Sequence, residues 1–276
     1  MSKSKEIKKR IKPDLPGGFR DYGPVDAIAK QGMIDTIRRT FESFGFDPPE
    51  TSSVQKTEVL TGGEEDSGKI IFNVKGSQEE ISDTSLRFDL TVPLARFVAD
   101  NPEIPKPFKR YQIGTVWRGE RQQAGRYREF MQADVDIVDV ASLDADAEIA
   151  AVIYDVFTKL PVRGFIIKYN SRNLLNILPR YAGFPEQNLW DALRIIDKAD
   201  RIGVYEVRNE LAKLFDQRIA EKIEKFIFGF PDDIQKSDTQ SIITNEYIEV
   251  RKRLEALNID CDRYFCLLYT SPSPRD

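Results

Sequence analysis

The chain has 276 residues, of which 41% are apolar and 31% charged, and its net charge is -4. This length and apolar content allow one large domain or two smaller ones with a real core, and the acidic balance excludes attraction to nucleic acid by net charge alone. The sequence contains no histidine, which excludes histidine as a base, nucleophile or metal ligand and leaves the chemistry to arginines, carboxylates and amides.

The N-terminal leader, residues 1–14, is basic and polar. It has no apolar run after it and therefore resembles neither a signal peptide nor a membrane anchor. Only two cysteines occur, Cys261 and Cys266, too few for a disulfide framework or a zinc site. We therefore expect a cytoplasmic protein that does not contact a membrane, although the basic leader leaves an organelle address open.

The first predicted element is an amphipathic helix over 25–44. It follows the turn-rich segment LPGGFRDYGP, carries apolar residues at helical spacing and ends at Gly45. Pro48 and Pro49 then favour an extended passage. Short strands are expected at 70–74 and 85–90, and a helix at 92–99.

Two segments with strict alternation follow, RYQIGTVWRGE at 110–120 and REFMQADVDIV at 128–138. Alternate residues of a strand lie on opposite faces of a sheet, and a short loop rich in Gln, Gly and Arg joins the two segments. They predict an antiparallel hairpin. Its mixed face would present Arg118, Glu120, Gln132 and Asp136 together.

The remaining sequence is mainly helical. We expect a helix at 144–160, a strand at 164–170 and a helix at 171–183. From 185 to 265 the apolar residues Trp190, Leu193, Ile196 and Ile202 mark one face of a charged helical region, which we interpret as a smaller insertion. No linker separates it from the preceding segment, so the boundary near residue 183 is soft.

The last eleven residues, CLLYTSPSPRD at 266–276, differ from the rest. They can be back-translated into a transposase-based sequencing adapter, and we expect them to be an artefact that replaces the natural continuation of the chain. The alternative is a natural disordered tail rich in serine and proline.

The hairpin could be a solvated sheet face, as charged strands commonly are. Three features favour a ligand site instead. Arginine suits an α-phosphate and a nearby carboxylate can accept a hydrogen bond from an adenine amino group, the loop supplies further cations for outer phosphates, and the return strand carries a polar pair suited to a small zwitterion. These features rest, in that order, on Arg118 with Glu120, on Arg121 with Arg126, and on Gln132 with Asp136. The sequence has neither a P-loop nor a dinucleotide fingerprint.

Several ordered segments resemble one family. FKRYQIGTVWRGERQQAGRYREFMQADVDIV closely resembles motif 2 of the class II aminoacyl-tRNA synthetases, in the form found in the histidyl-tRNA synthetase family. PGGFRDYGP resembles the family's N-terminal signature, FGFDPPETSSVQKTEVL its motif 1 region, and LRFDLTVPLARFVA its substrate-binding segment. The resemblance extends from residue 15 to about 203 and fades through the helical region.

This resemblance implies an α+β fold, a class II synthetase-like antiparallel sheet flanked by helices, with a helical insertion. It divides the chain into the leader, a catalytic core at 15–183, a truncated insertion at 184–265 and the adapter at 266–276. It also implies activation of histidine with ATP and Mg²⁺ to histidyl-adenylate, followed by transfer to tRNA(His), by positioning and charge stabilisation rather than by a protein nucleophile.

The resemblance also assigns site residues. Arg118 would be catalytic and hold the α-phosphate and the amino-acid carboxylate, with Glu120 at the adenine. Arg126, and more loosely Arg121 and Arg128, would face the outer phosphates or the acceptor end. The histidine-binding residues would be Asp89, Thr91 and Gln132 for the α-ammonium, and Asp136 for the imidazole. Gln122 and Gln123 would contact the tRNA acceptor stem, no residue is assigned to a metal, and Asp134 could equally be a supporting residue.

Other segments of the family are missing from this sequence, namely the histidine-specific R-G-[LF]-x-Y-Y segment, motif 3 and the anticodon-binding domain. We therefore expect the given chain to be inactive. Because motif 1 builds a dimer interface in such enzymes, we expect a homodimer.

Two alternatives stay open. One is the histidine-sensing, non-catalytic regulatory subunit of ATP phosphoribosyltransferase, which shares the catalytic fold. The other is a related synthetase for another amino acid, for which Asp136 is the discriminating residue.

Overall fold

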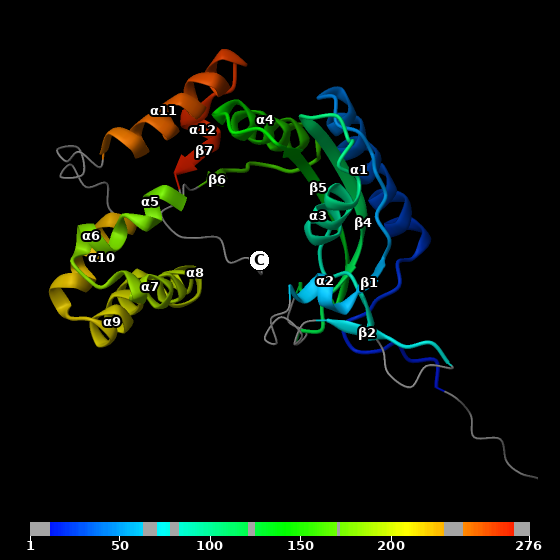
Figure 1. Cartoon of the computed structure of the whole chain (residues 1–276), viewed down its shortest axis with the longest axis horizontal. Coiled ribbons are helices and arrows are strands. Elements are labelled where there is room, and N and C mark those ends of the chain that lie inside the picture. The colour runs from blue at the N-terminus through cyan, green and yellow to red at the C-terminus, as the bar shows by residue number, and fades with distance from the viewer. Residues whose placement is uncertain are drawn as a thin grey trace, which may run out of the picture. The chain divides into compact units, whose positions relative to one another are not determined.

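The computed structural model describes residues 12–62, 71–77, 83–120, 125–169, 172–228 and 240–267. The chain divides into two compact units, the first ending at Val140 and the second starting at Ala141; Figure 1 labels their elements. The expected α+β class with antiparallel strands is confirmed. The predicted boundary near residue 183 is a different division and stays a prediction. Within the described ranges, no helix is long and apolar enough to cross a membrane.

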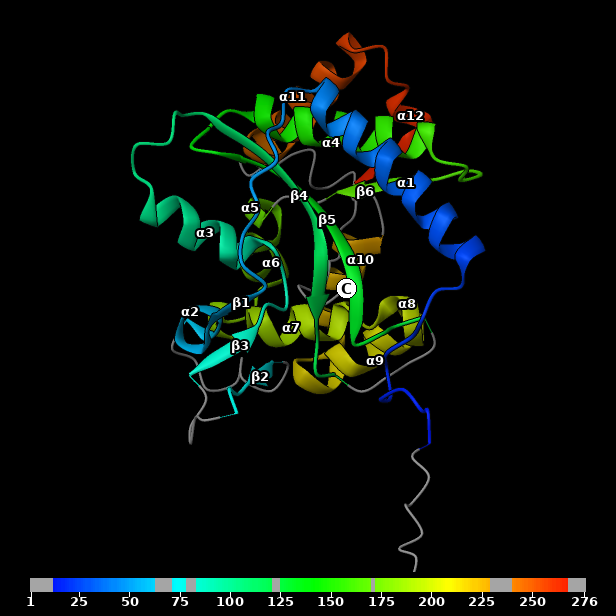
Figure 2. The same ribbon diagram turned by 90° about the vertical axis from the view of Figure 1, so that its right-hand side faces the viewer.

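The first unit is built on a long hairpin of β4 (Phe108–Trp117) and β5 (Glu129–Val138). The strands pair antiparallel from Phe108 opposite Val138 to Trp117 opposite Glu129, and Figure 2 shows them side by side along their length. The predicted hairpin is confirmed, but β4 ends at Trp117 and not at Glu120. Beyond Trp117 the Arg118 N–H still bonds the Arg128 carbonyl, but the Glu120 carbonyl accepts its hydrogen bond from a side chain, Arg128.

One face of this hairpin is covered by α1 (Pro24–Ser43), close to the predicted range. The rings of Phe41 and Tyr111 lie 5.5 Å apart, and the Tyr111 hydroxyl donates a hydrogen bond of 2.8 Å to Glu42. The helix begins at a proline, whose fixed φ suits a first turn. It is followed by Gly45 with φ 76°, a left-handed conformation that glycine adopts without strain.

The opposite face is covered by the segment after β3. A small antiparallel sheet, in the order β1-β3-β2, precedes it, and β3 ends at Leu86 rather than at the predicted Leu90. Residues 87–90 then turn onto the hairpin, and α1 and α3 lie on opposite sides of the β4–β5 ribbon (Figure 1). The bounds of these elements are β1 (Val54–Lys56), α2 (Thr57–Thr61), β2 (Phe72–Val74), β3 (Thr84–Leu86) and α3 (Thr91–Asp100).

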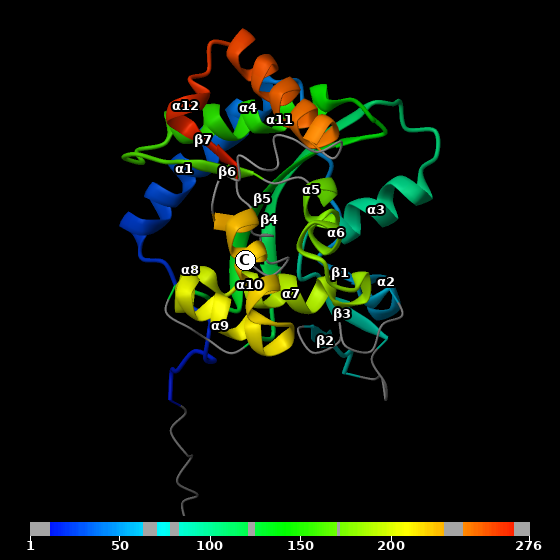
Figure 3. The same cartoon turned by 90° about the vertical axis from the view of Figure 1, so that its left-hand side faces the viewer.

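The second unit contains α4 (Leu143–Lys159), with α11 (Gln240–Ala256) beside it (Figure 3). Arg253 of α11 forms an ion pair with Asp144. Two short strands pair in parallel, β6 (Ile167–Tyr169) and, after α12 (Cys261–Tyr264), β7 (Phe265–Leu267). The backbone of β7 thus includes the first two residues of the suspected adapter, whose remaining residues, 268–276, lie outside the described ranges.

The rest of this unit is a group of short helices around one apolar core. The predicted helix at 171–183 is two helices, because Pro179 lacks the N–H that a continuous helix would need. The elements are α5 (Arg172–Asn176), α6 (Leu178–Ala182), η2 (Glu186–Asn188), α7 (Leu189–Ile196), α8 (Ala199–Ile202), α9 (Val204–Leu214) and α10 (Gln217–Phe228).

The predicted apolar face of this region is only partly right. Leu193 and Ile196 are buried in the core, but Trp190 is 58% exposed and Ile202 38% exposed. A spacing of three residues drifts by about 60° around a helix at each step. The buried stripe of α7 therefore runs through Ala192, Leu193 and Ile196, and Trp190 falls outside it.

Candidate functional site

The strand register brings the predicted polar residues of β4 and β5 onto one face. Arg110 lies opposite Asp136, Gln112 opposite Asp134, and Gly114 opposite Gln132. Because alternate residues of a strand share a face, Gln132 and Asp136 lie together with Asp134 between them. This grouping was predicted from the alternation of the sequence.

Arg118 lies immediately beyond the end of β4. Its backbone N–H still donates to the Arg128 carbonyl at 2.8 Å, so the chain keeps the direction of the hairpin there. Its guanidinium donates through Nε to the Phe88 carbonyl at 3.2 Å and lies 5.1 Å from the centre of the Phe130 ring. A cation over an aromatic face is stabilised by the ring's quadrupole, so these contacts orient the guanidinium beside the polar face.

Asp89 approaches the same face from the segment between β3 and α3. Its Oδ1 accepts a hydrogen bond of 3.1 Å from the Val92 N–H, which satisfies one of the free amides in the first turn of α3. Its carboxylate interacts electrostatically with Asp134, Arg118 and Arg110. The structure thus supports the grouping of Asp89 with the hairpin residues.

Thr91, predicted beside Asp89, is the first residue of α3 and its side chain is exposed. Its predicted role stays a prediction.

Arg110 is the largest fully buried side chain of the chain's described part. Its Nη2 lies 2.7 Å from Asp136 Oδ2 and donates to the Leu90 carbonyl at 3.2 Å, while Nε and Nη1 have no hydrogen-bond partner within the described ranges. A buried guanidinium requires a compensating anion. Arg110 is thus the counterion of Asp136, a role that its position opposite Asp136 in the strand register could have indicated.

Gln132 and Asp134 form a second polar pair. Gln132 Nε2 donates to both carboxylate oxygens of Asp134, at 2.9 and 3.0 Å. Gln132 Oε1 is buried and accepts no hydrogen bond from any residue that the structure describes. Asp136 Oδ2 likewise accepts no well-aligned hydrogen bond there, although Arg110 lies close to it. Gln132 Oε1 is therefore open to a donor, while Asp136 Oδ2 is ion-paired with Arg110 and has capacity for one more hydrogen bond.

Burial dominates the electrostatics of the three aspartates. Loss of hydration raises the pKa of Asp89, Asp134 and Asp136 above the usual aspartate value. The Gln132 hydrogen bond and the guanidiniums of Arg110 and Arg118 oppose this effect on the pKa of Asp134. For Asp136, Arg110 opposes it and Asp134 adds to it. A cationic ligand would favour the charged form of all three.

The remaining predicted residues belong to the sequence that joins β4 and β5. Glu120 is half-buried and Arg126 is exposed. Arg121, Gln122 and Gln123 lie outside the described residues. The predictions for all five stay untested.

Arg128, loosely predicted to face the outer phosphates or the acceptor end, contacts other parts of the chain. Its Nε donates to the Glu120 carbonyl at 3.0 Å, and its backbone N–H to the Gly18 carbonyl at 2.8 Å. Its side chain fills the space where a Cβ on Gly18 would lie, 2.7 Å from that position. Arg128 therefore fastens the N-terminal segment to the hairpin, and that packing explains why the segment needs a glycine.

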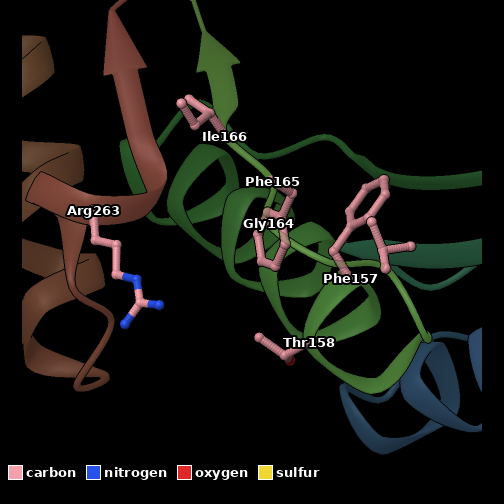
Figure 4. A pocket seen from close by; sticks show the side chains of 7 residues that line it. Phe157, Thr158, Gly164, Phe165, Ile166 and Arg263 are labelled. Atoms are coloured by element: carbon pink, nitrogen blue, oxygen red, sulfur yellow. The ribbon is translucent and has the colours of Figure 1, made fainter.

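A separate hollow of about 660 Å³ lies in the second unit, between the end of α4 and Arg263. Figure 4 shows Phe157, Phe165 and Ile166 along it. It contains none of the predicted site residues, and in the described ranges no group of three or more carboxylates or cysteines is arranged to hold a metal ion.

Comparison with known proteins identifies the family. The family model described as "Histidyl-tRNA synthetase" matches residues 18–260. Among curated proteins, the histidine–tRNA ligase of Aeropyrum pernix is 42% identical over 254 residues, covering 89% of this chain and 57% of that protein. The histidine–tRNA ligase of Clostridium tetani is 41% identical, covering 86% and 54%. This chain therefore spans about half the length of these relatives.

Solved structures agree. The histidyl-tRNA synthetase of Nostoc sp. PCC 7120 aligns with a TM-score of 0.80 at 30% identity, covering 94% of this chain and 62% of that one. A protein from Bacillus halodurans described as an ATP phosphoribosyltransferase regulatory subunit/histidyl-tRNA synthetase aligns with a TM-score of 0.77 at 19% identity, covering 94% and 69%, a likeness of fold. With its matched motifs and this extent of similarity, the chain belongs to the histidyl-tRNA synthetase family.

Proposed function

We propose that the polar face of the hairpin binds histidine and ATP and contributes to the formation of histidyl-adenylate, the first step of charging tRNA(His). In this proposal Gln132 and Asp89, with Thr91, receive the α-ammonium of histidine, and Asp136 receives an imidazole N–H. Arg118 binds the α-phosphate and the carboxylate of the amino acid.

The observation that carries the proposal is the separation of charge on this face. Gln132 Oε1 is buried and accepts no hydrogen bond from the described residues, and Asp136 Oδ2 has only the Arg110 ion pair. The Arg118 guanidinium is oriented beside them by Phe88 and Phe130. A zwitterion with an additional N–H donor has matching chemistry. Histidine carries an ammonium, a carboxylate and an imidazole N–H.

The proposed chemistry needs no nucleophile from the protein. A carboxylate oxygen of histidine attacks the α-phosphorus of ATP, and pyrophosphate leaves. Arg118 would neutralise charge that builds up on the α-phosphate oxygens in the transition state, while the acceptors hold the amino acid in place. The absence of histidine side chains from the chain is compatible with this mechanism.

Further parts of the proposal come from the family. Glu120 binds the adenine, Arg126 and Arg121 face the outer phosphates, and Gln122 and Gln123 contact the acceptor stem. Mg²⁺ enters with ATP, since phosphate oxygens and water satisfy most of its octahedral coordination. Transfer to tRNA(His) belongs to a whole protein of this family, and this chain covers only 57% and 54% of the two curated relatives.

We also propose a homodimer. Helix α1 exposes large apolar side chains, among them Val25 at 81% and Ile28 at 75%. Clustered exposed apolar side chains are common at interfaces between subunits. A monomer in light scattering at micromolar concentration would contradict this part.

The second candidate is a regulatory subunit that binds histidine without activating it, which the structural similarity to the Bacillus halodurans protein supports at the level of fold. The curated ligases, at about 40% identity, favour the catalytic proposal. Histidine-dependent exchange of pyrophosphate into ATP by the complete gene product separates the two.

Calorimetric titration of the chain with histidine tests the binding site directly. We expect saturable binding that Gln132→Met weakens about 10- to 100-fold, because a hydrogen bond to a charged group is lost. Gln217→Met, on an exposed part of α10, is the matched control and should bind as the parent does. Absence of binding to the parent, or equal loss in both variants, would contradict the proposal.

A further inference from the structure

Gln132 can present either end of its amide to a ligand, and only one end suits an ammonium. The carbonyl oxygen accepts hydrogen bonds, whereas the NH2 group would repel a second donor. On the hairpin face the amide has one orientation, with Nε2 toward Asp134 and the buried Oε1 without a hydrogen-bond partner among the described residues. What fixes this orientation also fixes which ligands the face accepts.

The Asp134 carboxylate fixes the orientation of the Gln132 amide. Asp134 in its charged form offers only acceptors, and both of its oxygens receive Gln132 Nε2, at 2.9 and 3.0 Å. The opposite amide orientation would bring Gln132 Oε1 against two carboxylate oxygens. Gln132 and Asp134 lie two residues apart on the same face of β5, so the strand itself holds them together.

We infer that Asp134 is a positioning residue that orients the Gln132 amide so that the site selects an α-ammonium over an α-hydroxyl. The inference rests on the proposed histidine site and deepens it. Asp134 acts through Gln132 and makes no contact with the ligand in this mechanism.

Asparagine at position 134 removes this constraint while keeping the size of the side chain. It can offer its NH2 group to Gln132, so the Gln132 amide is free to turn its own NH2 group toward the ligand. Histidine would then lose an acceptor and meet a donor. β-Imidazolyl-lactate, which carries a hydroxyl in place of the ammonium, can accept from that donor and loses less.

The test compares the dissociation constants of histidine and β-imidazolyl-lactate by calorimetry in the full chain. The parent should prefer histidine by about 10-fold or more, in keeping with one charged hydrogen bond. Asp134→Asn should reduce that preference at least about threefold. Asp139→Asn, which removes an exposed carboxylate at the end of the same hairpin, is the matched control and should leave the preference unchanged.

Loss of a negative charge could by itself weaken an ammonium more than a hydroxyl. A double-mutant cycle separates this effect: in a Gln132→Met background, Asp134→Asn should no longer change the preference. A preference that falls by the same factor in both backgrounds, or that stays at the parental value in Asp134→Asn, would overturn the inference.

A second measurement needs no ligand. In a ¹⁵N-labelled chain, the side-chain amide signals of Gln132, assigned by their loss in Gln132→Met, should move in Asp134→Asn and stay in place in Asp139→Asn. If the parent binds neither compound, the proposed function fails, and this spectrum alone decides the positioning role. Unmoved signals in a folded Asp134→Asn variant would overturn it.

Discussion

Charge balance on the hairpin face sets the kind of ligand it can hold. The carboxylates of Asp89, Asp134 and Asp136 interact with the guanidiniums of Arg110 and Arg118, so a fully ionised face carries one excess negative charge. A single ammonium compensates it. The net charge of this face is therefore negative, although the nearby sequence is rich in arginine, with Arg118, Arg121, Arg126 and Arg128.

Arg110 also explains how a face with three partly buried carboxylates is compatible with folding. Its side chain is fully buried and burial lowers its pKa, while Asp136, Asp134 and Asp89 raise it again. Removing one partner of such a pair leaves an uncompensated buried charge, at a cost of about 3–5 kcal/mol. Asp136 therefore contributes to stability as well as to the proposed binding of imidazole.

Asp89 gives a pH-dependent prediction, because its raised pKa makes the folded chain bind more protons than the unfolded chain. Between the unfolded and the folded pKa values, the free energy of unfolding falls as pH rises, by about 1.4 kcal/mol for each unit that separates them. Asparagine does not ionise, so the unfolding free energy of Asp89→Asn does not fall with pH for this reason. We expect the variant to gain stability relative to the parent as pH rises above the ordinary aspartate pKa, measured by urea unfolding at several pH values.

The comparison with alanine shows that the charge is responsible. Asparagine can still accept the Val92 N–H, whereas Asp89→Ala removes that cap and should lower stability by about 1 kcal/mol. The alanine variant should follow the same pH trend from a lower starting value. A difference between Asp89→Asn and the parent that does not change with pH would show that the Asp89 carboxylate titrates alike in both states.

At the scale of elements, the hairpin was the most predictable part of the fold. Eleven alternating residues on each side of a short loop fix which side chains share a face, and the register then follows once the strands pair. The alternation could not show where β4 ends. That depends on Arg128, whose side chain bonds the Glu120 carbonyl and also packs on Gly18, 110 residues away in the sequence.

The segment that carries Asp89 is held by another contact that sequence patterns do not reveal. Arg87 is buried and donates to the Thr51 carbonyl at 2.8 Å and the Thr115 carbonyl at 3.0 Å. Its Nη2 crosses β4 at Gly114, 2.6 Å from where a Cβ would stand. Because Gly114 has no side chain, Arg87 can reach both the Thr51 and the Thr115 carbonyls and join the two segments that contain them.

Gly114→Ala should therefore destabilise the fold and weaken histidine binding together. The methyl group would displace a guanidinium that two backbone hydrogen bonds hold in place, and overpacking of this kind costs about 1–3 kcal/mol. Chemical unfolding and calorimetric titration of the same preparation measure both effects.

Gly32→Ala provides the control for this substitution. Gly32 lies inside α1, where a Cβ meets nothing within 4 Å, and alanine favours a helix over glycine by up to about 1 kcal/mol. This variant should be more stable than the parent and bind histidine equally. Unchanged stability and binding in Gly114→Ala would show that Arg87 moves aside without consequence.

The helical elements were harder to predict than the hairpin. Amphipathic spacing located α1 and α4 to within a residue or two, because each presents one apolar stripe to a partner. In the region after residue 183 many short helices pack around a shared core, and the buried stripe changes from helix to helix. The sequence contains no signal for these changes, and Trp190 was misplaced for that reason.

At the scale of the whole molecule, the proposed site lies within one of the two compact units. Every described residue assigned to it precedes Val140, where the first unit ends. The large apolar cluster of the second unit, which includes Leu178, Ile196 and Phe226, contains no residue of the site. Family motifs in the sequence gave this location of the site, but the division into units arises from packing between distant segments.

The two tryptophans of the chain, Trp117 and Trp190, lie in different units and can report on each separately. In Trp190→Phe, fluorescence follows the first unit through Trp117, which is bonded to Glu129 at 2.7 Å at the end of the hairpin. In Trp117→Phe, it follows the second unit.

A ligand that binds only the folded state stabilises it by about 2.7 kcal/mol at 100 times its dissociation constant. Saturating histidine should therefore raise the unfolding midpoint of Trp190→Phe and leave that of Trp117→Phe unchanged, in thermal scans at equal protein concentration. Because Trp117→Phe also lacks the Glu129 bond, its histidine affinity is measured first and the ligand is kept at the same multiple of the dissociation constant. Equal shifts in both variants would show that the units unfold as one cooperative body, and a shift confined to Trp117→Phe would place the histidine site in the second unit.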